Sequence, residues 1–482
     1  MRTLALAAPL ALVLLMGGSV AAYGAERVDL LIVDATVIDV ATGELSNGAA
    51  VAVRGDTIIA VEPTAKAKAD FTASRTIEAK GRFVMPGLWD NHVHFGGGRE
   101  LIGENKALLP LYVAHGVTTV RDASGDLPEE VLAWRGEVAS GALFGPTIFT
   151  SGPKIEGVKP MWKGTIEVGT EAEADAALDR LQGLKVDFVK ITENTLTPQL
   201  FLYTVRQAKG RGLVTSAHIP AAITVDMASE AGLSSIEHMG YALRMGSPQE
   251  AQIAADVASG KISGAEATNR TLASFDEATA MAGFRRLAAR GTYVSPTLNG
   301  SKATAYLDQD DHKGDAYLAY IGKGLQATYA WRVERAAKDD AAAIARRHAI
   351  YEKNASLVPM LQAAGVSILA GTDAGFLNSF NYPGIGLHDE LKIYVDAGLS
   401  PLHALQASVV NGPRFLGHAD RYGAIAAGKA ADILILERNP LADIAATRAI
   451  DGVVLKGRYF DRKALDEMLK SAAEAAARSG GA

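Results

Sequence analysis

The stretch MPGLWDNHVHF (residues 85–95) holds a short apolar run that ends in two histidines separated by a single valine. Successive side chains of a β-strand point to opposite sides, so His92 and His94 share one side and can converge on one metal ion. A lone buried histidine is more often a structural residue than a ligand. The pair therefore predicts a metal site only if further ligands lie at the ends of neighbouring strands.

This run is the first of eight short apolar runs that alternate with helical stretches between residues 86 and 415. The runs are GLWDNHVH, VTTVRDA, TIFTSG, VDFVKI, LVTSAHI, SSIEHM, YVSPTL and SILAGTD. Alternating strands and helices form parallel βα units, and eight units in about 330 residues fit an α/β fold, the (β/α)8 TIM barrel. Two Ala- and charge-rich insertions, around 247–290 and 302–361, interrupt the series and could cover the mouth of the barrel.

Both ends of the chain carry short β-rich runs that are separated by turns and not by helices. Residues 27–85 read as hairpins, and similar runs return at 416–463 in segments such as GAIAAGKAADILILERNPL. Two such segments that flank a barrel predict one composite β-sandwich domain, interrupted by the barrel as a large insertion. Residues 464–482 are expected to form a C-terminal helix that ends in a polar tail.

Residues 1–25 carry the three parts of a secretory signal peptide. Arg2 gives a short positive region, an apolar core follows at 4–16, and small residues lie around 22–25. The apolar run is too short to span a bilayer, and cleavage after Ala22, Gly24 or Ala25 would suit the preference for small residues. We therefore expect a secreted or periplasmic protein with no membrane attachment after cleavage. An uncleaved membrane anchor is the alternative.

Composition narrows the classes of partner and cofactor. The formal net charge of −6 provides no basic footprint, so nucleic acid is not an expected partner. Cysteine is absent, which excludes disulfides, thiolate ligands and a cysteine nucleophile. Any metal must be bound through nitrogen and oxygen, which favours zinc and leaves manganese, cobalt and iron open. A homo-oligomer is compatible with the sequence.

Residue types that bind metals recur at the ends of the predicted strands. The carboxyl ends of all barrel strands meet on one face, where active sites form. Each residue has a simpler explanation by itself: a satisfied core histidine, a helix-capping aspartate, or a lysine that extends to solvent. Their joint placement, in chain order, favours a site. The candidates are His92 and His94 on the first strand, Lys190 on the fourth, His218 on the fifth, His238 on the sixth and Asp373 on the eighth.

The sequence resembles the amidohydrolase superfamily, in particular its prolidase-like and imidazolonepropionase-like branch. The resemblance covers nearly all of the chain after residue 25. It rests on the segments VMPGLWDNHVH, HGVTTVRDASG, VDFVKI, TSAHI, SSIEHM, ILAGTDAG, LHDELKIYVDAGLSPLHALQASVVNGPRFLG and YGAIAAGKAADILILERNPLADI.

The resemblance implies a pair of divalent metal ions. His92, His94 and Asp373 would hold the first ion, and His218 and His238 the second. Lys190 would bridge the pair as N6-carboxylysine, because an ammonium group has no lone pair to offer. The chain continues as KITENT after this lysine, where many relatives have a Gly-rich continuation.

The expected reaction is hydrolysis of a C–N bond in a small amide substrate, such as a dipeptide or an N-acyl amino acid, by a metal-bridging hydroxide. Asp373 would accept the proton of the nucleophile and deliver it to the leaving nitrogen. A cyclic amidase of imidazolonepropionase type, or a lactone or phosphoester hydrolase, is the alternative on the same scaffold. A non-catalytic binding protein is a more remote one.

Other polar residues near the strand ends are expected to support the metal ligands or to have a purely structural role. Arg121 and Asp122 close the second strand and are candidates to support the ligands from behind. His388 opens a helix after the eighth strand and is a third candidate. His115 precedes the second strand, at the opposite end of the barrel, and is expected to be structural.

Overall fold

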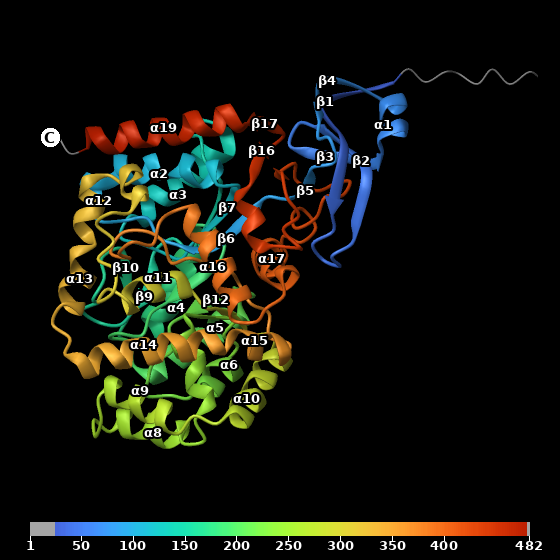
Figure 1. The fold of residues 1–482 in the computed structure, drawn as a ribbon. Coiled ribbons are helices and arrows are strands. Elements are labelled where there is room, and N and C mark those ends of the chain that lie inside the picture. Colours follow the sequence, from blue (N-terminus) through green and yellow to red (C-terminus); the bar gives the residue numbers. More distant parts are fainter. Residues whose placement is uncertain (1–24, 480–482) are drawn as a thin grey trace, which may run out of the picture.

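The computed structural model describes residues 25–479, and Figure 1 shows a helix-covered barrel with a smaller β domain at one side. Apart from Ala25, the predicted signal peptide at residues 1–25 lies outside the described residues. Among residues 25–479, no helix combines the length and the apolarity that a membrane crossing requires.

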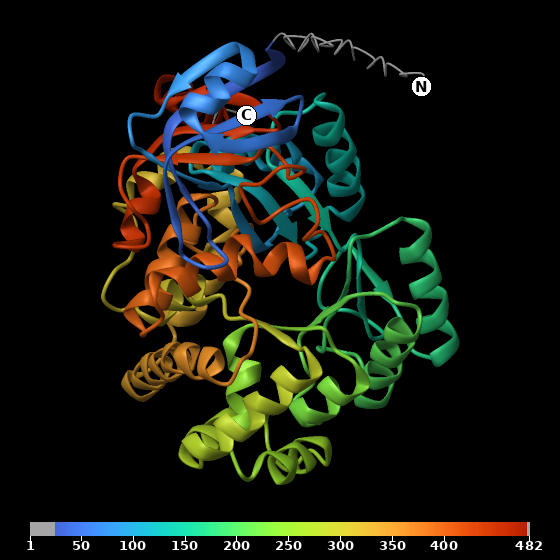
Figure 2. The same cartoon turned by 90° about the vertical axis from the view of Figure 1, so that its right-hand side faces the viewer.

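The small domain is one eight-stranded sheet made by both ends of the chain. Its strands are β1 (Glu26–Ile38), β2 (Leu45–Arg54), β3 (Thr57–Pro63), β4 (Phe71–Glu78), β5 (Phe83–Pro86), β15 (Ile433–Leu436), β16 (Ile450–Leu455) and β17 (Arg458–Asp461). They follow the order β17-β16-β15-β5-β1-β2-β3, and β4 also pairs with β1. Antiparallel pairing of β5 with β15 joins the two ends, which lie side by side in Figure 2. The predicted composite β domain is confirmed.

The long strand β1 buries both of its faces. Leu30 and Ile32 belong to one apolar cluster, whereas Leu31 and Val33 belong to a second cluster on the other face. This period of two is the pattern of a strand that is covered on both sides. The helix α1 (Thr64–Asp70) contributes Ala67 to the second cluster.

The parallel strands of the barrel form two hydrogen-bonded groups. The strands are β6 (Leu88–Val93), β7 (Val117–Asp122), β8 (Thr147–Thr150), β9 (Lys154–Glu156), β10 (Thr165–Glu167), β11 (Val189–Ile191), β12 (Thr215–Ala217), β13 (Ser235–Glu237) and β14 (Tyr293–Ser295). One group has the order β6-β7-β8, and the other has the order β10-β9-β11-β12-β13-β14. All pairs within these groups are parallel, as the alternation of strands and helices predicts.

The predicted run TIFTSG (147–152) holds β8, and the third strand of the barrel resumes after Pro153 as β9. Gly152, between them, has φ +58, in the left-handed region that favours glycine, and Pro153 has no N–H for a ladder. The strand nevertheless joins the two groups of the barrel. The amide of Asp187 donates to Thr150 O on β8 at 3.0 Å, and that of Thr192 donates to Ile155 O on β9 at 3.0 Å.

The eighth predicted strand closes the barrel through isolated bridges instead of a regular ladder. Ile368 bridges Val294 of β14, and Ala374 bridges Val93 of β6. The buried carboxylate of Asp90 reinforces this seam, because it accepts hydrogen bonds from Thr372 N at 2.9 Å and Thr372 Oγ1 at 2.7 Å. The eight-unit barrel predicted from the sequence is therefore present, with one irregular strand.

Gly371 lies where this irregular segment approaches β6. A Cβ atom on Gly371 would lie 2.6 Å from His92 Cβ and 2.7 Å from His92 N. We expect Gly371→Ala to lower the free energy of unfolding by about 1–3 kcal/mol, the usual effect of overpacking. Gly103→Ala, in open space on a helix, should be neutral or stabilising. Urea unfolding of both variants tests this, and equal midpoints would contradict it.

Helices surround the barrel and follow its strands. They are α2 (Ile102–Ala114), α3 (Pro128–Ser140), α4 (Glu171–Gly183), α5 (Pro198–Gly210), α6 (Val225–Ala231), α10 (Glu277–Arg290), α15 (Val358–Ala363), α16 (Ile385–Asp396), α17 (Pro401–Val409) and α18 (Asn411–Phe415). Side-chain caps fix several starts: Thr170, Thr197 and Thr224 accept backbone N–H groups of α4, α5 and α6. Short 3₁₀ turns lie at Arg99–Leu101, Leu243–Gly246, Ala316–Tyr320 and Ile444–Arg448.

Two helical insertions interrupt the units, as predicted. The first holds α7 (Met239–Ala242), α8 (Glu250–Ala258) and α9 (Gly264–Ala273) before α10. The second holds α11 (Leu298–Ala305), α12 (Lys323–Thr328), α13 (Ala330–Ala336) and α14 (Ala341–Ser356). The predicted C-terminal helix is α19 (Arg462–Arg478), which lies along α2 in Figure 1 and buries Ala472 there.

Candidate active site

The structure brings the six candidate ligands together at the carboxyl ends of the barrel strands. His92 and Lys190 lie within β6 and β11; His94, His218 and His238 directly follow β6, β12 and β13; Asp373 lies in the closing segment. Ring nitrogens of His92 and His238 and a carboxylate oxygen of Asp373 lie within 4.8 Å of one another. These residues therefore converge, as the barrel geometry predicts.

The hydrogen bonds of His92 and His94 direct their Nε2 lone pairs into the site. His92 Nδ1 lies 2.5 Å from Glu237 Oε2, and His94 Nδ1 donates to the carbonyl oxygen of Ser124. Burial lowers the pKa of His92 to about 3, so its ring is neutral. With Nδ1 as the donor, each Nε2 carries a lone pair. The two Nε2 atoms nevertheless lie only 3.2 Å apart.

His218 and His238 repeat this arrangement. His218 Nδ1 lies 3.1 Å from Glu193 Oε2, and His238 Nδ1 lies 2.6 Å from Thr297 Oγ1. The Thr297 hydroxyl donates to Pro296 O, so it accepts from the His238 ring. Burial holds the pKa of His238 well below its usual value. The Nε2 atoms of the two rings face each other at 3.0 Å.

This concentration of acceptors fits divalent cations. Asp373 Oδ1 lies 2.9 Å from His94 Nε2 and 3.6 Å from His92 Nε2. A carboxylate oxygen therefore lies beside the Nε2 lone pairs of these two histidines. Neutral imidazole and carboxylate groups are the ligands that zinc and similar ions accept, and hydrogen bonds at the second ring nitrogen orient such ligands. Without a cation between them, these lone pairs repel one another. The donor set therefore fits a metal centre.

Lys190 is a buried residue whose terminal nitrogen is not hydrogen-bonded by the described part of the protein. Its side chain is 1% exposed, and Nζ has no hydrogen-bond partner among the described residues. Burial lowers the pKa of Lys190 to about 8, which favours the neutral amine. An enclosed amine whose pKa is lowered, beside the histidine pairs, fits the carboxylated lysine that the resemblance implies, because it loses its proton more readily and a carbamate would bring two oxygens to this place.

Glu237 organises the site from behind and was not identified from the sequence. It is fully buried and accepts hydrogen bonds from Arg121, Ser216 and Ser235 besides its contact with His92. Burial alone would raise the pKa of Glu237, but Arg121 and His92 outweigh that effect and hold it well below its usual value. The only available signal was a glutamate at the end of a predicted barrel strand, directly before His238.

Arg121 lies behind the ligands, as expected, and connects three strands. Its Nη2 is 2.9 Å from Glu237 Oε2, its Nε donates to Asn91 O, and its guanidinium lies between the rings of Phe188 and Phe415. Its charge therefore compensates that of Glu237 within the barrel interior.

Asp122 and His388 differ in their distance from the cluster. Asp122 accepts a 2.7 Å hydrogen bond from Thr150 Oγ1 and lies next to the site, where burial raises its pKa to about 6. The prediction for His388 is wrong: its ring is paired with Thr447 Oγ1 and with the carbonyl oxygen of His115, both at 2.9 Å. The loop at 375–384 sets the start of α16 so that this ring lies beside the structural His115 instead of the ligands.

A second unrecognised carboxylate orients the other histidine pair. Glu193 contacts His218 and accepts a hydrogen bond from Tyr241, whose ring stacks on that of His218 at 5.4 Å. Burial would raise the pKa of Glu193, but His218 and the hydrogen bonds outweigh it and lower the pKa to about 2. Glu193 belongs to the KITENT segment, which differs from the Gly-rich continuation of many relatives.

Backbone strain coincides with the ligands. His238, Asp373 and Thr297 have φ values of +70, +63 and +50, in a region that non-glycine residues rarely adopt. Hydrogen bonds hold two of these positions: His238 N donates to Ser295 O at 2.8 Å, and Asp373 N donates to His92 O at 2.7 Å. Asn378 adds a side-chain bond to Asp373 O. The fold thus fixes the direction of these side chains.

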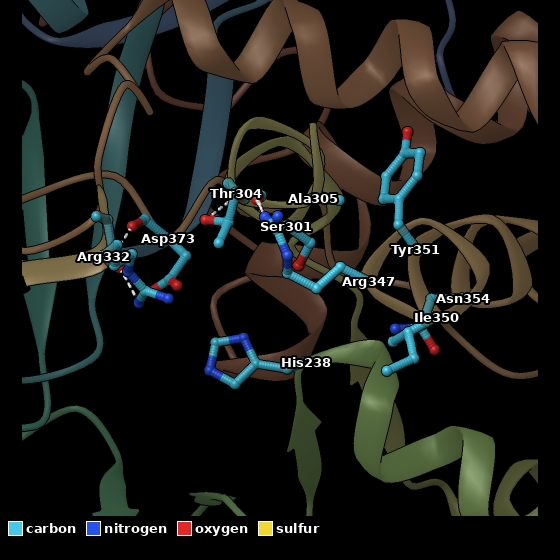
Figure 3. A pocket seen from close by; sticks show the side chains of 12 residues that line it. His238, Ser301, Thr304, Ala305, Arg332, Arg347, Ile350, Tyr351, Asn354 and Asp373 are labelled. Atoms are coloured by element: carbon cyan, nitrogen blue, oxygen red, sulfur yellow. Dashed lines mark hydrogen bonds between the residues drawn. The ribbon is translucent and has the colours of Figure 1, made fainter. Parts of the chain in front are cut away.

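Two cavities open onto the cluster, and His238, Arg332, Asp373 and Asn378 line both of them. The larger, of about 370 Å³, is roofed by the second insertion; Figure 3 shows Asp373 and Arg332 at one end and Tyr351 and Asn354 at the other. The smaller, of about 120 Å³, contains His94, Lys190 and His218. The expectation that an insertion covers the barrel mouth holds for the second one. Helices α8 and α9 of the first insertion border a separate cavity of about 390 Å³.

The barrel has its polar cluster at the carboxyl ends of the strands with a cavity above it, which is the layout of a barrel enzyme. The sequence pattern of the Amidohydrolase family matches residues 83–459, and the chain belongs to this family. It is thus an enzyme of a family whose members act on amide and related bonds.

Individual relatives are distant. Ochratoxinase of Aspergillus niger is 23% identical over 436 residues, covering 78% of this chain and 75% of the relative. Imidazolonepropionase of Chloroflexus aggregans is 50% identical over 52 residues, which cover 11% of this chain and 12% of that protein. A bottromycin amidohydrolase structure superposes with a TM-score of 0.71 at 22% identity, covering 92% of this chain and 90% of that one. A Xaa-Pro dipeptidase structure with bound methionine gives a TM-score of 0.66 at 21% identity, covering 90% and 99%. At these identities the structural likeness shows the fold alone.

Proposed function

We propose that this chain is a binuclear-metal amidohydrolase that cleaves the C–N bond of a small amide, a dipeptide or an N-acyl amino acid. The observation that carries this proposal is the two facing histidine couples together with Lys190, whose Nζ has no hydrogen-bond partner among residues 25–479 and lines the same cavity. Similarity to proteins named ochratoxinase, Xaa-Pro dipeptidase and bottromycin amidohydrolase supports a substrate of the amide type.

The ligands divide between two ions. His92, His94 and Asp373 would hold one ion, and His218 and His238 the other, with zinc the ion that suits this nitrogen and oxygen set. Lys190, as N6-carboxylysine, would offer one oxygen to each. The deprotonated fraction of its Nζ, increased by the lowered pKa, would form the new bond to the carbon of CO₂ and release a proton, which would leave a carbamate of charge −1. When bound, the ions would supply an acidified water and a polarised substrate carbonyl.

The protein's own groups perform the proton transfers and the positioning. Asp373, oriented by its strained backbone and by Asn378, accepts a proton from the attacking water and delivers it to the departing nitrogen. Protonation is needed because an amide anion is a poor leaving group. Glu237 and Glu193 keep His92 and His218 in the tautomer that presents Nε2. The second insertion limits the access of bulk water.

Hydrolysis by the purified, zinc-loaded protein tests the proposal. We expect activity on dipeptides and N-acyl amino acids in a panel that also contains lactams, lactones, phosphoesters and aminopurines. Release of the amine is followed by chromatography, with a metal-chelated sample as the control. Hydrolysis confined to esters or lactones, or full activity after chelation, would contradict the proposal.

A further inference from the structure

Two cations that the metal centre does not use line the smaller cavity. Lys154 follows the break in the third strand, and Arg332 reaches in from α13 of the second insertion. Both share this cavity with His94, Lys190, His218 and Asp373. Neither belongs to the ligand set, so their presence beside the cluster needs another explanation.

Lys154 is a largely buried residue that borders the smaller cavity. Its side chain is only 6% exposed, and within residues 25–479 it forms no hydrogen bond or ion pair. Asp122, Asp126 and Glu156 act on it electrostatically from beyond ion-pair distance. A buried ammonium group is costly unless an acceptor satisfies it. An acceptor that enters the cavity would do so.

Arg332 is positioned by neutral groups. Its Nε donates to Leu377 O at 2.9 Å, and its Nη2 donates to Asn378 Oδ1. No described carboxylate forms an ion pair with Arg332, whereas Arg347 in the larger cavity is paired with Asp339 at 2.8 Å. Arg332 borders both cavities, whereas Lys154 borders only the smaller one, so the two cations without a described ion-pair partner meet in the smaller cavity.

Apolar groups complete the wall beside these two cations. Trp162 and Trp331 line the same cavity and contact each other edge to face, with ring centroids 6.1 Å apart; Phe376 lies on the same wall. An aromatic surface next to two cations suits a carboxylate that carries an apolar side chain.

We propose that Lys154 and Arg332 bind the free carboxylate of the substrate, so that the amino-acid part occupies the smaller cavity and the neutral acyl part the larger one. His238 and Asp373, which line both cavities, lie where the scissile bond would join the two parts. This inference rests on the proposed amide hydrolysis and specifies its substrate class: N-acyl amino acids and dipeptides with a free α-carboxylate and an apolar side chain.

A pair of substrates that differ only by the carboxylate tests the inference. The wild-type enzyme should prefer N-acetyl-L-phenylalanine to N-acetyl-2-phenylethylamine by about 100-fold or more in kcat/KM. Lys154→Met and Arg332→Gln should each reduce this preference by about 10- to 100-fold, the effect of a lost hydrogen bond to a charged group. The matched controls are the exposed Lys163→Met and Arg335→Gln, which should keep the preference. Equal losses on both substrates, or an unchanged preference, would overturn the inference.

Binding of a carboxylate without a scissile bond separates the inference from the proposed reaction. The zinc-loaded protein should bind 3-phenylpropanoate at least ten times more tightly than 3-phenylpropanol, and Lys154→Met and Arg332→Gln should weaken this binding about 10-fold or more. Calorimetry provides the readout. If no amide is hydrolysed but this binding pattern holds, the proposed reaction fails and the carboxylate site stands. If both variants bind 3-phenylpropanoate as the wild type does, the carboxylate site is wrong.

Discussion

Replacing Asp373 by Asn is expected to lower kcat for amide hydrolysis by about 10²- to 10⁴-fold, the usual contribution of a general acid–base group. Asparagine keeps the shape and one oxygen of the side chain, but it cannot carry the proton from water to the leaving nitrogen. The strained φ of +63 at this residue, together with the bond from Asn378, keeps the side chain directed at the histidines. Steady-state kinetics on the best amide of the panel provides the measurement.

The control for this variant is Asp420→Asn, which changes an exposed carboxylate remote from the cluster. Asp420→Asn should keep full activity and change stability by less than about 0.5 kcal/mol, the effect of a surface substitution, and circular dichroism should show that Asp373→Asn is still folded. Full hydrolytic activity in Asp373→Asn would remove this residue from the proton transfer and contradict the assigned role.

The second large effect is expected for stability. Glu237→Gln should lower the free energy of unfolding of the metal-free protein by about 3–5 kcal/mol, because Arg121 would keep a buried charge without its partner. The carboxylate is fully buried and is approached by a guanidinium, an imidazole and two hydroxyls. An amide cannot accept from all of these groups at both of its ends.

Urea unfolding measures this change, with Glu167→Gln as the control. Glu167 ends the edge strand β10 and is exposed, so its replacement should alter stability by less than about 0.5 kcal/mol. Similar unfolding midpoints for the two variants would show that Glu237 does not organise the barrel interior in the way described.

The parts of the fold that follow from a repeating pattern could be predicted from the sequence. Strand–helix alternation specified a parallel barrel, and the strand ends specified which of the polar side chains would meet, because all carboxyl ends share one face. The break at Gly152 and the isolated bridges of the closing strand depend on local backbone conformation. Such local conformations produce no periodic pattern of side chains, so the periodicity of the sequence could not predict them.

The supporting residues were harder to predict for reasons that differ from one to another. Glu237 directly precedes a ligand, and strand alternation would place the two side chains on opposite sides. The positive φ of His238 breaks that alternation, so that both groups serve the cluster. His388 was misplaced because the course of the loop before α16 decides which end of the barrel its ring reaches. Arg332 comes from a helical insertion without a motif, so only the folded chain brings it to the cavity.

The central claim is a site for two metal ions that Lys190 bridges. The most direct measurement is the metal content of the purified protein, saturated with zinc and freed of excess metal, by inductively coupled plasma mass spectrometry. The claim predicts two ions per chain at full activity, and fewer than two in Lys190→Met. One ion per chain in a fully active enzyme would contradict it.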